Sequence, residues 1–152
     1  MALRNIRQKD DPVLRKKCKT VEVFDEKLGQ LIDDMTETLY KAQGVGLAAP
    51  QVGILKRVVV IDVGDGLIEA VNPEIIKKSG KQRGVEGCLS CPQQWGYVTR
   101  PAKCRLKAQD RHGEFFEMNL TELGAVCACH EVDHLDGRLF IDIVEEFVQP
   151  EE

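Results

Sequence analysis

A long central stretch of the chain, Arg57–Leu120, most limits how it can fold, because one strand-like segment follows another there with no helical segment between them. It opens with Val58-Val59-Val60-Ile61, a short apolar run that is typical of a buried strand. Strands joined without helical crossovers pair as antiparallel neighbours. Asn72-Pro73 is expected to separate two strands, and Arg111-His112-Gly113 to form a hairpin turn. The expected strands are Arg57–Val63, Leu67–Val71, Glu74–Ser79, Trp95–Arg100, Lys103–Asp110 and Glu114–Leu120.

Two helices are expected to flank this stretch. The first follows a capping Asp25, carries apolar residues at spacings of three and four, and should end near Gly44. The second covers Glu122–Leu135, with Thr121 as its cap and Gly137 placed to stop it.

The two ends of the chain differ in character. The segment up to about Thr20 is turn-rich, whereas Arg138–Val148 is apolar and should fold back onto the core. With 152 residues, no repeat and no linker, residues 1–152 are expected to form a single domain. The predicted fold class is therefore α+β, with mostly antiparallel β-sheets around a central helix, Glu122–Leu135.

Composition and charge exclude several classes of protein. The formal net charge is -4 and the basic residues are spread along the chain, so there is no direct nucleic-acid motif. No apolar segment approaches the roughly 20 residues that span a bilayer, and the N-terminal residues do not resemble a secretory signal. We therefore expect a cytoplasmic protein without membrane contact, whose six cysteines are reduced thiols.

The motif His130-Glu131-Val132-Asp133-His134 indicates a catalytic metal site on the second helix. Residues four apart lie on one helix face, so His130 and His134 can bind one cation. Glu131 can stand beside that cation and accept a proton from its bound water. Chance pairing of two histidines is the plain alternative, but the chain has only three histidines and this helix is apolar.

A catalytic metal normally takes a third protein ligand, for which Cys, Asp, Glu and the remaining His112 are candidates. His112 lies in a predicted turn, where an exposed side chain is the simpler interpretation. Cys88 stands out by its context, Glu86-Gly87-Cys88-Leu89-Ser90, because Gly87 permits unusual backbone angles beside a sulfur that binds zinc or ferrous iron well.

A third segment, Gly44–Gln51, is built from small residues that allow another chain to approach its backbone closely. Taken alone, it is most simply a turn that links helix to sheet. It is not a phosphate-binding loop, because no Lys-Ser/Thr pair follows its glycines.

Together these three segments resemble the signature motifs of the peptide deformylases, in the order in which that family carries them. Gly44–Gln51 resembles the first motif, Glu86–Ser90 the second and His130–Gly137 the third. The resemblance extends from about Asp11-Pro12 to about Val144, which is nearly the whole chain.

The resemblance implies a metal-dependent hydrolase of protein biosynthesis. Cys88, His130 and His134 match the metal ligands, and Glu131 matches the general acid/base. One divalent ion is implied, Fe2+ first, with Zn2+ or Ni2+ as alternatives. Metal-bound water would attack the formyl carbon of an N-terminal formylmethionine, and Glu131 would pass the proton to the leaving amine as formate is released. The implied partners are N-formylmethionyl nascent peptides, and a transient contact with the ribosome is compatible with the resemblance.

Further positions match substrate contacts. Gln51 and the backbone N–H of Leu89 match the donors to the formyl oxygen, and Gly46 matches a position that lines the substrate cleft. An apolar pocket for the methionine side chain is expected beside the ligands on the second helix, lined by Leu123, Val126 and Cys127.

Two other functions remain open. A metallopeptidase shares the His-Glu-x-x-His motif, although its third ligand would more often be Glu or His. A non-catalytic zinc-stabilised module would leave Glu131 without a task. Cys91 and Cys129 depart from the family pattern and are expected to act as small buried hydrophobes. Cys88-x-x-Cys91 could also be half of a zinc ribbon, but no second such pair is present.

Overall fold

The structure is a computed structural model that describes residues 2–148 and, within them, two α-helices and eight strands. The helices are α1 (Glu26–Lys41) and α2 (Glu122–Leu135). The strands are β1 (Gly46–Ala48), β2 (Val58–Ile61), β3 (Ile68–Ser79), β4 (Gln82–Cys88), β5 (Cys91–Arg100), β6 (Lys103–Gln109), β7 (Phe115–Thr121) and β8 (Glu146–Phe147). Short 3-10 helical turns occupy Pro12–Arg15, Ala49–Val52 and Phe140–Asp142. Over the described range, no helix is long and apolar enough to cross a membrane.

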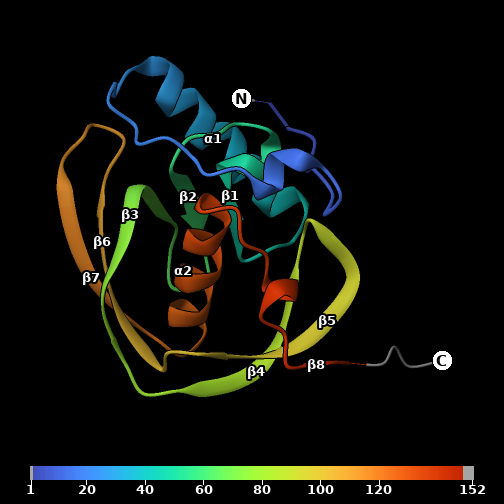
Figure 1. Ribbon diagram of the computed structural model, residues 1–152. Coiled ribbons are helices and arrows are strands. Elements are labelled where there is room, and N and C mark those ends of the chain that lie inside the picture. The colour runs from blue at the N-terminus through green and yellow to red at the C-terminus, as the bar shows by residue number, and fades with distance from the viewer. Residues whose placement is uncertain (1, 149–152) are drawn as a thin grey trace.

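The strands form two sheets in which every neighbouring pair is antiparallel. One sheet has the order β1-β2-β3-β6-β7, and the other has the order β4-β5-β8. Figure 1 shows α2 in the middle of the molecule, with β3, β6 and β7 to its left, β5 to its right and α1 above. The expected α+β fold with antiparallel sheets is confirmed.

The apolar run of β2 is buried because both of its faces are covered. Val59 and Ile61 pack into a cluster with apolar residues of β6 and α2. Val58 and Val60 pack into a second cluster, built largely on α1. Side chains alternate between the faces of a strand, so a strand covered on both sides needs consecutive apolar residues. Each such side chain contributes roughly 1.5–3 kcal/mol to folding when it is buried.

Both helices begin where the sequence predicts. The carboxylate of Asp25 accepts a hydrogen bond from the Leu28 N–H at the start of α1. This helix ends short of Gly44, because Gln43 takes the left-handed conformation, at φ 56°, that a glycine usually supplies. The bounds of α2 are as expected, although the Thr121 side chain makes no capping hydrogen bond.

The expected break at Asn72-Pro73 is wrong, since β3 continues through it. The register of β3 against β6 shifts between Val71 and Glu74, and Asn72 has a φ of 52°. The Asn72 side chain accepts a hydrogen bond from the Val21 N–H and donates to the Gln109 side chain. Because its polar groups are satisfied, the bulge is tolerated and the strand resumes beyond it.

The hairpin of β4 and β5 is the main element that the sequence does not predict. The sequence predicts no strand over Gln82–Cys88 and only the second half of β5. Glu86 is the single buried residue of β4, so the strand lacks the apolar alternation that identifies a strand. The hairpin pairs Glu86 with Gly96 and Cys88 with Cys91, and it therefore decides where the Cys88 side chain lies.

The segment Arg138–Val148 folds back only in part. Leu139 and Phe140 are buried in a third apolar cluster, as expected. Ile143 and Phe147 stay exposed. This part of the segment leads to β8, which pairs with β5 at the edge of the smaller sheet.

Candidate active site

Helix α2 divides its side chains between a sheet face and a site face. Ala125 and Ala128 pack against the larger sheet. His130 and His134 follow on another face, one helical turn apart, since each residue advances the helix by about 100°. Both imidazoles are buried, and their ring centroids lie 5.0 Å apart.

The β4–β5 hairpin brings a sulfur atom to these rings. Cys88 is the last residue of β4, and its Sγ lies 3.3 Å from Nε2 of His134. The ligand atoms of Cys88, His130 and His134 all lie within 4.8 Å of one another. Among residues 2–148, Cys91 is not part of this group of potential ligands. Three donors from two distant parts of the chain therefore meet at one point.

The donors and their surroundings fit a divalent metal ion. One sulfur and two imidazole nitrogens form a set that zinc and ferrous iron accept. Burial, together with neighbouring positive charge, holds the pKa of His134 well below its usual value, so the neutral ring keeps a lone pair. The Cys91 thiol, burial and the Glu131 carboxylate all raise the pKa of Cys88. A positive ion between the donors would reverse that effect and stabilise the thiolate.

Glu86 orients the first histidine. Its Oε1 lies 2.8 Å from Nδ1 of His130, which leaves Nε2 of that ring for a ligand bond. The buried Arg100 donates hydrogen bonds to both oxygens of Glu86, at 2.8 and 2.9 Å, and a further one to Asp133. Burial alone would raise the pKa of Glu86, but the hydrogen bonds from His130 and Arg100 outweigh it and lower that pKa to about 2.

Glu131 lies beside the three donors with a free carboxylate oxygen. Its Oε1 is buried and has no hydrogen-bond partner within the described residues. Burial raises the pKa of Glu131 to about 7. The backbone of Gly46 passes so close that a Cβ atom there would lie 2.5 Å from Glu131 Oε2. The carboxyl group is thus held between β1 and the donors, and it titrates near neutral pH.

Gln51 contacts Cys88 through its side chain, and Leu89 is the next residue in the chain. The side-chain oxygen of Gln51 accepts the Ala48 N–H at 2.9 Å, while its amide nitrogen donates to Ser90 at 3.1 Å and lies 3.5 Å from the Cys88 sulfur. Leu89 follows Cys88 at the tip of the hairpin. The amide of Gln51 is therefore fixed with its NH2 group directed at the cluster of donors.

A cavity of about 570 Å3 opens beside the donors. The indole of Trp95 forms part of its wall and covers Gly87 so closely that a Cβ atom at Gly87 would overlap the ring. The residues expected to bind substrate all line this cavity: Gly46, Leu123, Val126 and Cys127.

Three residues at the site are not singled out by the sequence: Glu86 as a histidine partner, Arg100 and Trp95. Glu86 could have been found from the sequence, because it is a charged residue between glycines just before Cys88. The other two make their contacts across the hairpin, so no local pattern marks them.

Proteins of known family resemble this chain over nearly its whole length. The sequence model of the polypeptide deformylase family matches residues 3–149. The peptide deformylase of Caldicellulosiruptor bescii is 59% identical over 152 residues, covering 100% of this chain and 92% of that protein. The peptide deformylase of Acetivibrio thermocellus is 56% identical and covers 100% and 89% of the two chains.

Solved structures share the fold of this chain. The crystal structure of the peptide deformylase from Thermotoga maritima superposes with a TM-score of 0.92 at 44% identity, covering 94% of this chain and 98% of that one. The peptide deformylase from Synechococcus elongatus, solved in complex with actinonin, has a TM-score of 0.90 at 39% identity, covering 93% and 79%. The chain therefore belongs to the peptide deformylase family, whose metal-dependent members remove the formyl group from the N-terminal formylmethionine of new proteins.

Proposed function

We propose that Cys88, His130 and His134 hold one divalent metal ion, and that Glu131 moves protons while the formyl group of a nascent protein is removed. The observation that carries this proposal is the convergence of one sulfur and two imidazoles within 4.8 Å, beside a buried carboxyl group and a cavity. Residues 1–152 act in it as a single catalytic domain.

A divalent ion, when bound, supplies Lewis acidity that lowers the pKa of water to about 7 and polarises the formyl oxygen. We assign Fe2+ to the site, because thiolate and imidazole ligands suit ferrous iron and the family resemblance points to it; Zn2+ or Ni2+ can substitute. The ionised Glu86 accepts the Nδ1 hydrogen of His130 and so keeps that ring in position.

Glu131 holds the proton that the reaction must move. With a pKa raised by burial to about 7, its carboxyl group is present in both forms near neutral pH. As a carboxylate it takes the proton of the attacking water, and as an acid it delivers that proton to the leaving nitrogen. The products are formate and a free amino group on methionine.

Gln51 and the Leu89 N–H stabilise the oxyanion that develops on the formyl group. The anchored amide of Gln51 needs no reorientation during the reaction, because Ala48 already fixes its oxygen. Losing one such donor typically raises the barrier by about 3–4 kcal/mol.

The substrate peptide binds along β1. This strand is an edge of the larger sheet and reaches the cavity through Gly46. An extended peptide can add to such an edge by backbone hydrogen bonds. Its methionine side chain then enters the cavity between the helix residues Leu123, Val126 and Cys127.

Formate release from formyl-Met-Ala-Ser, by protein purified without oxygen, tests the proposal. The unchanged protein should turn over, and Glu131→Ala should lose activity by about 10²–10⁴-fold while keeping its metal content. Substantial turnover by that variant would remove Glu131 from the mechanism. Cleavage of internally blocked peptides would favour a metallopeptidase, and no formate release at full metal content would favour a non-catalytic module.

A further inference from the structure

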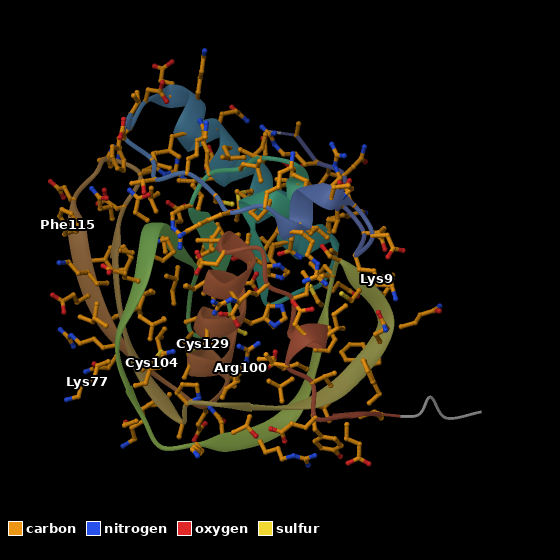
Figure 2. All side chains as sticks on the ribbon, viewed as in Figure 1. Lys9, Lys77, Arg100, Cys104, Phe115 and Cys129 are labelled. Atoms are coloured by element: carbon orange, nitrogen blue, oxygen red, sulfur yellow. The ribbon has the colours of Figure 1, made fainter. Side chains whose placement is uncertain are left out.

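A second pair of sulfur atoms lies on the sheet face of α2, where the proposed reaction does not use them. Along β6, Cys104, Leu106 and Ala108 alternate towards the core cluster that contains Ala125 and Ala128 of α2. Cys129 lies four residues after Ala125, so it shares the face that α2 presents to the sheet. Figure 2 labels Cys104 and Cys129 close to this boundary.

The two thiols are in contact with each other. The thiol of Cys129 lies within hydrogen-bond reach of the Cys104 sulfur, and the positive charge of Lys78 acts on the Cys104 side of the pair. Lys78 is the cross-strand partner of Cys104 on β3 and is exposed. Cys104 is the second residue of β6, and the side chains of Cys104 and Cys129 keep a small exposed fraction, 5% and 6%.

The other cysteines are less suited to form a disulfide in the metal-loaded protein. Cys88 is assigned to the metal, and its neighbour Cys91 then has no free thiol as a partner. Burial raises the pKa of Cys18 to about 11, and Cys127 lines the cavity. Cys104 and Cys129 are the adjacent pair whose sulfurs are both uncommitted.

We propose that Cys104 and Cys129 are a site of reversible oxidation, where a peroxide converts the two thiols into a disulfide that ties β6 to α2. The Cys104 sulfur attacks the O–O bond of hydrogen peroxide, which forms an S–OH group and releases one water. The Cys129 sulfur then attacks the Cys104 sulfur, the S–O bond breaks, and the Cys129 proton leaves with that oxygen as a second water. Both thiols are oxidised, and one peroxide is reduced to two waters.

Peptide mapping of the protein loaded with Zn2+, which hydrogen peroxide does not oxidise, tests the proposal. The protein is treated anaerobically with one equivalent of hydrogen peroxide, unfolded, alkylated and digested with trypsin. Trypsin releases Cys104 in the dipeptide Cys104-Arg105 and Cys129 in residues 112–138. We expect these two peptides joined, about 2 Da below the sum of their reduced masses, with fragmentation placing the bond at Cys129 rather than Cys127. Two of the six thiols should escape alkylation and return after dithiothreitol.

Two variants sharpen the test. Cys104→Ser should lose the cross-link and keep Cys129 open to alkylation after peroxide. Cys18→Ser removes another buried thiol and should form the cross-link as the unchanged protein does. The proposal is wrong if the unchanged protein keeps Cys104 as an alkylated thiol, carries it as a sulfinic acid without a link, or joins it to a cysteine other than Cys129.

Discussion

Gly46 lies so close to the proposed base that its lack of a side chain is itself part of the site. A Cβ atom there would lie 2.5 Å from Glu131 Oε2 and 2.9 Å from Glu131 Cδ. A Cβ atom essentially never lies within 3.0 Å of a non-bonded atom. Any side chain at position 46 therefore has to displace the carboxyl group of Glu131. The family resemblance predicts that Gly46 lines the substrate cleft, and the structure adds a second reason for a glycine at this position.

We therefore expect Gly46→Ala to lower kcat by about 10²-fold, the effect of moving a catalytic group by roughly 1 Å. Metal content and the midpoint of urea unfolding should change little. Gly84→Ala on β4 is the matched control, because nothing lies within 4 Å of a Cβ atom there. Equal rates of formate release from the two variants would contradict the expected contact with Glu131.

Glu86 should make stability depend on pH in the acid range. Its pKa is lowered from 4.5 to about 2 in the folded protein, so its stabilising effect is complete above about pH 4.5 and is lost as the pH falls towards 2. A shift of this size corresponds to about 3 kcal/mol. Glu86→Gln should remove that contribution and leave the buried Arg100 without its counter-ion.

Urea unfolding between pH 3 and pH 7 measures this effect. The unchanged protein should lose stability steeply below pH 4.5, whereas Glu86→Gln should be less stable at pH 7 and show a flatter acid limb. Glu114→Gln, which removes an exposed carboxylate from the β6–β7 turn, should follow the unchanged protein. Parallel acid limbs for all three proteins would show that the Glu86 pKa is not lowered by folding.

The sequence identifies site residues that belong to a local motif. It misses site residues whose role depends on a partner distant in sequence. His130 and His134 are recognised because helical spacing places them on one face. Arg100 is missed because its role depends on Glu86, which the β4–β5 hairpin brings opposite it. Cys88 stands between these cases: its local context suggests a ligand, but only the hairpin places its sulfur 3.3 Å from His134.

At the scale of elements, the end of α2 is fixed by its contact with the N-terminal 3-10 turn, Pro12–Arg15. Gly137 ends the helix at a φ of +78°, and its N–H donates to the carbonyl of His134. A Cβ atom at Gly137 would lie 2.6 Å from the carbonyl oxygen of Arg15. That neighbour is backbone, so it cannot move aside as a flexible side chain can.

We expect Gly137→Ala to destabilise the protein by about 2–4 kcal/mol, which combines left-handed strain with overpacking. Gly113→Ala is the matched control, because its φ of +88° imposes similar strain while its nearest neighbour, the Phe24 ring, stays at 3.4 Å. The midpoint of urea unfolding should fall further for Gly137→Ala. Equal losses of stability in the two variants would mean that the Pro12–Arg15 turn moves aside and does not fix the end of α2.

Elements are predictable where a cap or a periodic pattern marks them. Asp25 marks the start of α1, and the apolar run of β2 marks a strand buried on both faces. β4 has neither signal, because its one buried residue is the charged Glu86 and the strand owes its form to pairing with β5. The continuity of β3 is also hidden, since the Asn72 bulge is stabilised by partners distant in sequence, Val21 and Gln109.

At the scale of the whole molecule, most of the apolar core lies apart from the proposed metal site, although both use α2. The two larger core clusters join α1, β2, β6 and the sheet face of α2 without the three donors, whereas Cys88 packs against the smaller third cluster around Leu139 and Phe140. Most of the folding free energy should therefore come from apolar burial. The donors stand on the remaining face of α2 and on the hairpin, where a bound ion adds to the stability of the folded state.

Removal of the metal should accordingly abolish activity and leave the fold in place. A ligand present at 100 times its dissociation constant stabilises the folded state by about 2.7 kcal/mol, which corresponds to roughly 5–10 °C in Tm for a chain of this size. Chelation should lower Tm by that amount, keep the far-UV circular dichroism at 25 °C unchanged, and reduce formate release by more than about tenfold. Re-addition of Fe2+ without oxygen should restore both, and addition of Mg2+ should restore neither, because its hard oxygen preference does not suit one thiolate and two imidazoles. A chain that unfolds on chelation would instead make the ion a structural element, as in a zinc-stabilised module, and the division between core and site would be wrong.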